Sequence, residues 1–357
     1  MKKKILSIFM AALMVVLMLP TQAFATEEMV YFSISDDGIF IASDFDGKML
    51  AHLAVPFSEL EAIDLAEYGL EEYAVDNNGD GKDDLTVLHL YLYTHEKHYY
   101  EGAEQFAACA QGAPGSIFFT WFWGHDCNLN YYVNGEYPLA YDGWGATADT
   151  IVIEPGDFVD IMMFSSWDFY SDSGAGFHNF FDENGIVHEM TFEEGEEAEF
   201  MLKRGYGNIS IGGATMYDPV PNVPVYYSQS GVYAEDALET ESDENGNVSI
   251  TFPSSGTWYV WMDGQKGIDF PNAVVSSPAY LEITVESSIV KGDISGDGEV
   301  APADAAFAYA AYNGAKELSD EQKAAADVNG DGEITPADAA LIYAFYNGKI
   351  TEFPSGK

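Results

Sequence analysis

The chain has 357 residues, with 14 Lys and Arg against 59 Asp and Glu, which gives a formal net charge of −45. A surface this acidic repels phosphate backbones and anionic lipids, so the charge excludes nucleic-acid binding and membrane docking through basic residues. The 47% of hydrophobic and 15% of aromatic residues are too many for a disordered acidic tail. The length predicts two or three folded domains.

Residues 1–25 have the pattern of a secretory signal peptide. Three lysines, Lys2 to Lys4, precede an apolar stretch from Ile5 to Leu19, and Ala23-Phe24-Ala25 fits the small-x-small rule for cleavage. The stretch is shorter than the roughly 20 residues of a membrane-spanning helix. We therefore expect an exported protein, extracellular or on the cell surface, without membrane insertion.

Residues 26–195 are predicted to form a β-rich α+β domain. Strand-like segments at 30–35, 39–43 and 49–55 are separated by turn residues, and a short helix is expected within 60–68. Residues 85–100 predict an amphipathic helix with Leu88, Leu92 and His95 on its apolar side. Further strands are expected at 118–123, 129–135 and 150–164.

Two features of this domain leave alternatives open. Asp76, Asn78 and Asp80 have the spacing of calcium ligands, but the twelfth position is Val87, so the segment predicts either a calcium site outside the EF-hand type or a solvated turn. Cys109 and Cys127 predict either one disulfide or two separate buried thiols.

Part of the first domain resembles the transcobalamin-like C-terminal domain family. The resemblance lies in TVLHLYLY, WGHDCNLNYYVNG and IEPGDFVDI, all within residues 86–164. It implies a small β-rich module with one helix, and it does not imply that this chain binds cobalamin.

Residues 196–287 are predicted to form an Ig-like β-sandwich. VPVYYS, DENGNVSITF, GTWYVWMDG and AYLEITV alternate apolar and polar residues at about ten-residue spacing, with an Asn-Gly turn at 245–246. The segment resembles the bacterial Ig-like spacers of surface proteins.

Four tryptophans of the first domain are candidates for stacking on neutral sugars, whose C–H faces pack on aromatic rings. Trp121 and Trp123 alternate in a predicted strand and would share one face. Trp144 and Trp167 lie in loops rich in Gly and Asp, which are poor core material. The alternative for all four is that they belong to the core.

The strongest signal is a repeat with an offset of 34 residues near the C-terminus. DISGDGEVAPADAAFAYAAYNG (293–314) and DVNGDGEITPADAALIYAFYNG (327–348) agree at 15 of 22 positions. Each copy places oxygen-bearing residues at positions 1, 3, 5, 7 and 12 of a calcium loop, with Gly at the turn in position 6. The predicted ligands are Asp293, Ser295, Asp297, the Glu299 carbonyl and Asp304 in the first copy, and Asp327, Asn329, Asp331, the Glu333 carbonyl and Asp338 in the second.

The expected helices complete a small all-α unit over residues 288–357. One helix follows each loop, at 303–313 and 337–347, and ends in Asn-Gly. A short helix at 320–326 begins with a capping box formed by Ser319 and Gln322.

This order of loops and helices closely resembles a dockerin module with duplicated EF-hand-like loops. The resemblance implies two bound calcium ions and a cohesin module of a scaffold protein as partner. It assigns the partner-facing surface to Pro302, Ala303, Tyr309, Pro336, Ala337 and Tyr343. Because the copies are nearly symmetric, it also implies binding in two orientations.

These features predict a non-catalytic, secreted component of a cohesin–dockerin complex of the cellulosome or amylosome type. Its β-rich modules are expected to bind a neutral polysaccharide such as starch or cellulose. The alternatives are a dockerin-borne hydrolase, such as a glycoside hydrolase, and a structural or protein-binding spacer. No catalytic motif stands out, and so many acidic residues make any single carboxylate pair uninformative.

Overall fold

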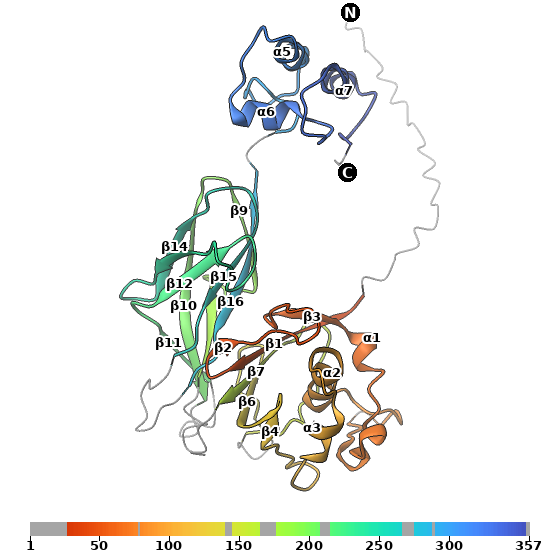
Figure 1. The fold of residues 1–357 in the computed structure, drawn as a ribbon. Coiled ribbons are helices and arrows are strands. Elements are labelled where there is room, and N and C mark those ends of the chain that lie inside the picture. The colour runs from red at the N-terminus through yellow and green to blue at the C-terminus, as the bar shows by residue number, and fades with distance from the viewer. Residues whose placement is uncertain are drawn as a thin grey trace, which may run out of the picture.

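The computed structural model describes residues 27–77, 79–139, 145–164, 176–207, 215–265, 275–287 and 290–354. Strands dominate up to residue 287 and helices dominate after it (Figure 1). The predicted signal peptide lies outside the described residues. Within the described parts of the chain, no helix is long and apolar enough to cross a bilayer.

The first unit is built on a five-stranded mixed sheet. Its strand order is β2-β1-β7-β6, and β3 pairs with the first half of β1 on the same edge as β2. β1 and β7 are parallel, whereas the other pairs are antiparallel. The strands are β1 (Met29–Asp36), β2 (Ile39–Phe40), β3 (Leu53–Pro56), β6 (Asn128–Val133) and β7 (Phe158–Phe164). A separate hairpin joins β4 (Trp121–Phe122) to β5 (His125–Asp126).

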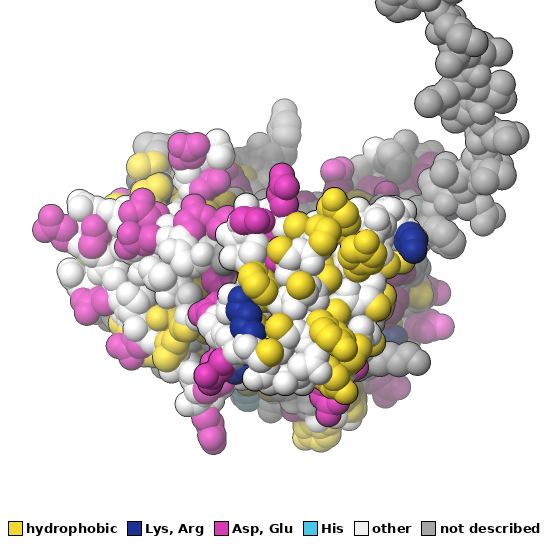
Figure 2. Space-filling model, turned by 90° about the horizontal axis from the view of Figure 1, so that it is seen from above, with side chains coloured by type: hydrophobic (Ala, Val, Ile, Leu, Met, Phe, Trp, Pro, Cys, Tyr) yellow, Lys and Arg dark blue, Asp and Glu magenta, His cyan; other side chains and the backbone are white. Residues whose placement is uncertain are grey.

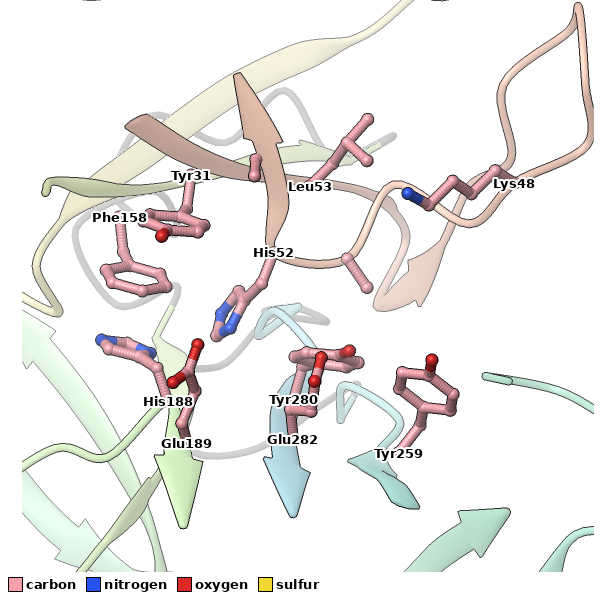
Figure 3. Close-up of a pocket in the computed structure, with 12 residues that line it drawn as sticks. Tyr31, Lys48, His52, Leu53, Phe158, His188, Glu189, Tyr259, Tyr280 and Glu282 are labelled. Atoms are coloured by element: carbon pink, nitrogen blue, oxygen red, sulfur yellow. The ribbon is translucent and has the colours of Figure 1, made fainter. Parts of the chain in front are cut away.

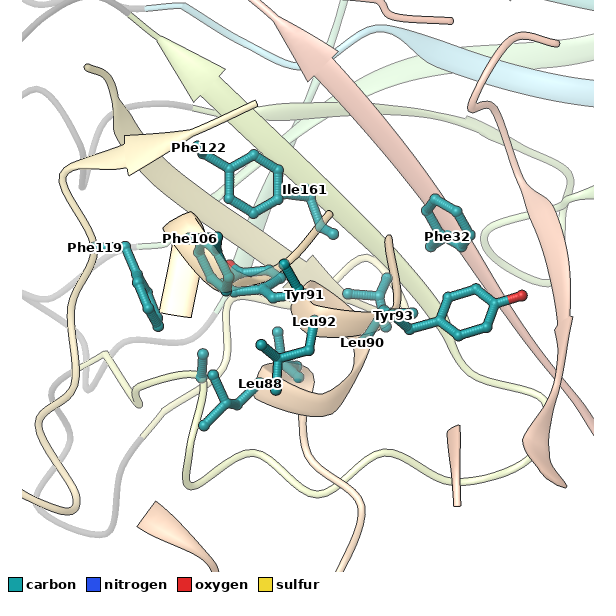
Figure 4. Close-up of a cluster of buried hydrophobic side chains, with 14 of the residues drawn as sticks. Phe32, Leu88, Leu90, Tyr91, Leu92, Tyr93, Phe106, Phe119, Phe122 and Ile161 are labelled. Atoms are coloured by element: carbon teal, nitrogen blue, oxygen red, sulfur yellow. The ribbon is translucent and has the colours of Figure 1, made fainter. Parts of the chain in front are cut away.

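The helices of the first unit pack on this sheet. They are α1 (Phe57–Leu60), the 3-10 turns Leu65–Tyr68 and Glu71–Tyr73, α2 (Val87–His98) and α3 (Glu104–Ala108). In α2, every side chain from Val87 to His95 is buried, so the prediction of an amphipathic helix is wrong. The reason is that the sheet covers one side and β4 and α3 cover another, with Tyr91 among Phe106, Phe119 and Phe122 (Figure 4).

The second unit consists of two sheets packed face to face. One has the order β11-β10-β14 with β8 beside β10, and the other has the order β13-β12-β15-β16-β9. Buried residues of both sheets, such as Phe200, Val248, Trp258 and Leu281, form one core. The strands are β8 (Phe177–Phe181), β9 (Glu189–Glu193), β10 (Glu197–Gly207), β11 (Thr215–Pro219), β12 (Pro224–Ser228), β13 (Leu238–Glu241), β14 (Asn247–Thr251), β15 (Gly256–Met262) and β16 (Ala279–Glu286).

The sandwich begins earlier than residue 196, where the sequence placed its start. β8 pairs with β10, and β9 pairs with β16 in parallel. Both strands precede the predicted boundary. Sequence separation hides the pairing of β9, since its partner β16 lies about 90 residues further along the chain.

The two β units contact each other directly. Gly264 N–H donates to the Gly38 carbonyl at 2.6 Å, and Phe40 N–H donates to the Tyr233 hydroxyl at 3.0 Å. Phe40 also packs beside Trp261, which is 2% exposed and therefore belongs to this junction rather than to a binding surface.

The C-terminal unit contains three helices, α5 (Pro302–Tyr312), α6 (Asp320–Ala326) and α7 (Pro336–Tyr346). Pro302 and Pro336 begin α5 and α7, where a missing N–H costs nothing. Ser319 Oγ accepts the Gln322 N–H at 3.2 Å, so the predicted capping box of α6 is present. α5 and α7 pack together over a small core that includes Ile342.

Candidate functional site

The first repeat folds into a loop wrapped around the Asp293 carboxylate. Its Oδ1 accepts the backbone N–H groups of Gly296 and Asp297 at 2.7 and 3.3 Å and the Ser295 hydroxyl at 3.0 Å. Its Oδ2 accepts Gly298 N–H at 2.6 Å. Burial acts to raise the pKa of Asp293, but these bonds, led by that of Gly298, outweigh it and hold the pKa below its ordinary value. Gly298 has φ +88°, the left-handed turn expected at position 6.

The second repeat forms an equivalent loop around Asp327. Its Oδ1 accepts Asp331 N–H at 3.2 Å, and its Oδ2 accepts Gly332 N–H at 2.9 Å. Asn329 Oδ1 also accepts Asp331 N–H at 2.8 Å, and Asp331 Oδ1 accepts Glu333 N–H at 2.9 Å. Gly332 has φ +83°, matching its counterpart in the first loop.

The carboxylates at position 12 are fully buried. Asp304 and Asp338 are each 0% exposed. Asp304 accepts the N–H groups of Ser295 and Ala301, both at 2.8 Å, and Asp338 accepts Thr335 N–H at 2.9 Å. Among the described residues, neither carboxylate forms an ion pair. A buried carboxylate without a cationic side chain is stable when it coordinates a metal ion, so this chemistry fits calcium.

The ligand sets are mixed in type. Within the described part of the chain, no three Asp, Glu, His or Cys side chains converge as a metal cluster. A calcium ion in the first loop would therefore also need oxygen ligands from the Ser295 side chain, the Glu299 carbonyl and water. An ion in the second loop would need the Asn329 side chain, the Glu333 carbonyl and water.

Four exposed tyrosines lie on α5 and α7, and we call them the tyrosine face. They are Tyr309, Tyr312, Tyr343 and Tyr346, which are 53%, 54%, 52% and 53% exposed. In each helix the two ring centroids lie 6.4 Å apart. Viewed from above these helices, hydrophobic side chains gather in one region, which Lys or Arg side chains border on two sides and acidic groups border elsewhere (Figure 2). Exposed aromatic clusters of this kind mark protein interaction surfaces.

The structure leaves the predicted partner-facing residues accessible. Pro302, Ala303, Pro336 and Ala337 are all exposed at the starts of α5 and α7. The sequence interpretation missed Tyr312 and Tyr346. The signal was present, because residues three apart lie on the same side of a helix.

The Asp76 loop has hydrogen bonds that parallel those of the two repeats. Asp76 accepts the N–H groups of Gly79 and Asp80 on Oδ1 at 2.7 and 3.2 Å, and that of Gly81 on Oδ2 at 3.0 Å. Asp84 accepts Asn77 N–H at 2.7 Å. Asn78 lies outside the described residues, and calcium binding by this loop stays a prediction.

The tryptophan predictions divide in two. Trp144 and Trp167 lie outside the described residues. Trp121 is 8% exposed and its ring lies near His95, so it is a core residue and offers no face to a sugar. Trp123 is partly buried against Tyr99 and has φ +49° in the turn after β4, so the two tryptophans do not share a strand face.

Both cysteines are free thiols. Cys109 is partly exposed and Cys127 is buried, and burial raises the pKa of Cys127 to about 12. Of the two alternatives that the sequence left open, the structure shows the unbridged one.

Comparisons with known proteins add one family match. The model of the dockerin type I domain matches residues 291–345. Two similar solved structures are the third cohesin ScaC in complex with the ScaB dockerin from Acetivibrio cellulolyticus, carrying an IN to SI mutation in the N-terminal or the C-terminal helix. The matched chains are 33% identical and cover 19% of this chain and 94% and 96% of their own length.

With a TM-score of 0.18 in each case, these structures carry no argument about the fold. No curated protein matches the chain. The resemblances to the transcobalamin-like and Ig-like families stay predictions, since the family match lies outside those regions. Dockerin type I domains bind calcium, which agrees with the buried carboxylates and left-handed glycines of both loops. Residues 291–345 are a dockerin type I domain.

Proposed function

We propose that this chain is an exported component of a cohesin–dockerin assembly, attached to a cohesin module of a scaffold protein through the tyrosine face. The observation that carries the proposal is the symmetric display of two exposed tyrosine pairs on α5 and α7, above two equivalent calcium-type loops. Burial of tyrosines in an interface contributes much of the binding energy in many complexes.

The proposal includes one calcium ion in each loop. Metal binding and folding are coupled in small domains that build a site from loop residues. The core of the C-terminal unit is small, since three of its seven buried residues are alanines. Chelation of calcium from the full chain should therefore remove the helical structure of residues 290–354 and abolish cohesin binding. Persistence of both with excess chelator would contradict the calcium assignment.

Binding is tested with a panel of type I cohesins that includes the third cohesin of ScaC. If both orientations bind, Tyr309→Ala or Tyr343→Ala alone removes one of two equivalent modes and lowers affinity about twofold, whereas the double variant loses about 2 kcal/mol or more. Tyr100→Ala is the matched control, because Tyr100 is 64% exposed in the first β unit. Unchanged binding by the double variant would refute docking through the tyrosine face.

For the β-rich units, binding of starch or cellulose through Trp144 and Trp167 stays a proposal. Retention of the full chain on these insoluble glycans, and loss of retention in Trp144→Ala and Trp167→Ala, would support it. Product release from a glycan panel would favour the hydrolase alternative instead. The absence of both retention and product release would favour a structural or protein-binding spacer.

A further inference from the structure

A pocket of about 260 Å3 lies where the sheet of the first unit meets the β9-β16-β15 side of the sandwich (Figure 3). None of its lining residues belongs to the site described above. Its volume falls just below the roughly 300–1,000 Å3 of pockets for drug-sized ligands, so it has room for a single ring.

Strand register brings the two walls of this junction pocket together. On one side, Tyr31 is paired with Ala54 of β3 and with Phe158 of β7, so the three side chains form a row across the sheet. On the other side, Glu282 is paired with Glu189 of β9 and with Tyr259 of β15, which forms a second row. The pocket is the space between the rows.

The aromatic rings of the pocket are fixed by one another. Tyr31 stacks on Phe158 at 4.4 Å between centroids, and Phe158 stacks on His188 at 3.6 Å. His52 stands edge-on to His188 and to Tyr280, at 4.9 Å from each. The pocket is therefore largely formed before any ligand arrives.

Two buried ring nitrogens beside this pocket have no hydrogen-bond partner within the part of the chain that the structure describes. The His52 side chain is 7% exposed, and its Nδ1, like that of His188, has no hydrogen-bond partner among the described residues. Burial lowers the pKa of His188 to about 4 and that of His52 well below 6.5, so both rings are neutral. Because both nitrogens are buried, the polar groups that a ligand can reach are those at the pocket surface, from Lys48, Glu189 and Glu282.

We propose that the junction pocket binds one ring of a neutral, polyhydroxylated ligand, as a free sugar or as the terminal sugar of a chain. The lining supplies what adjacent hydroxyls need: carboxylates of Glu189 and Glu282 as acceptors, the Lys48 ammonium as a donor, and tyrosine rings for C–H faces. Anions are disfavoured by the two carboxylates. Lys48 offsets one of these two carboxylate charges, and the imidazoles add none.

The experiment is a titration of the full chain, followed by calorimetry, with a panel of hexoses and pentoses and with their short oligomers. We expect saturable binding of at least one neutral sugar with one site per chain. Equal affinity for the monosaccharide and its oligomer indicates a free-sugar site, and tighter binding of the oligomer indicates a chain end.

Glu282→Gln should weaken this binding at least about tenfold, because it removes a charged acceptor while keeping the shape. Glu286→Gln on the same strand is the matched control, and it should bind as the parent does. Tyr259→Phe provides a second variant that removes only a hydroxyl, and thermal unfolding checks that each variant folds. The proposal would be overturned by absence of binding across the panel or by unchanged affinity in both pocket variants. Selective binding of choline, a cation, would overturn it as well.

Discussion

Ile342 and Ala308 form a large and small pair in the core of the dockerin domain. They occupy equivalent positions of the repeat, 34 residues apart, and both are 0% exposed between the packed helices α5 and α7. Ile342→Ala leaves a cavity and should cost about 2–5 kcal/mol. Ala308→Ile overfills the core and should cost about 1–3 kcal/mol.

The swapped double variant, Ala308→Ile with Ile342→Ala, restores the total volume and should cost less than about 1.5 kcal/mol. The two single costs add to at least about 3 kcal/mol, so the double variant should be at least about 1.5 kcal/mol more stable than additivity predicts. Such a coupling would show that the two repeats are packed as complementary halves.

Hydrogen exchange of the calcium-saturated full chain measures these costs locally, in peptides that cover residues 302–312 and 336–346. The exposed equivalents Ala306 and Ala340 are the control, since Ala→Ser at either should change the opening free energy by less than about 0.5 kcal/mol. If the core substitutions are additive within about 0.5 kcal/mol, the proposed complementarity is refuted.

Three further predictions concern other parts of the chain. Phe353 stacks on Phe345 at 4.7 Å and lies over Gly292, so Phe353→Ala should destabilise the dockerin domain by about 1–3 kcal/mol in the same exchange measurement, and Phe353→Leu by less. Cys127 should resist a thiol reagent until the chain unfolds, because burial raises its pKa to about 12, whereas Cys109 should react in the native protein. Acid should destabilise the β units. Burial holds the pKa of several imidazoles near 4, whereas the pKa of an imidazole in the unfolded chain is near 6.5. The unfolded chain therefore binds more protons than the folded chain between these pH values. The stability that these neutral imidazoles contribute is complete above about pH 6.5 and is lost as the pH falls toward 4. The measurement is the urea midpoint of the full chain, and equal midpoints at pH 7.5 and pH 4.5 would contradict the prediction. The imidazoles concerned are His89, His95, His178 and His188. Asp160 acts in the opposite sense, since burial raises its pKa to about 6, but it is a single group.

The C-terminal unit was predictable from the sequence because its determinants are local. Pro at the first helical position, Gly at position 6 and the Ser319 capping box each act within a few residues, and the repeat supplies them twice. The helix bounds consequently differ from the predicted ones by one residue or less.

The β units were predicted less well because their determinants are distant. The parallel pairing of β9 with β16 and of β1 with β7 joins segments that no local pattern relates. The tertiary environment also determines the burial of α2. Its alternating Leu and Tyr residues are compatible with a surface helix, but β4 and α3 cover the side that would otherwise be exposed. The junction pocket was beyond sequence reasoning for the same reason, since its walls come from six strands and the loop before β3.

The acidic surface of the β units differs in charge from the tyrosine face. Residues 26–290 carry 47 acidic and 6 basic residues, whereas neither Ala305–Tyr312 nor Ala339–Tyr346 contains a charged residue. Eight of the 12 acidic residues after residue 290 lie in the two calcium-type loops, where two bound calcium ions would offset half of their charge. Most of the net charge of −45 therefore lies on the β units rather than on α5 and α7. If the tyrosine face docks as proposed, we expect its affinity to come mainly from apolar area and hydroxyl hydrogen bonds.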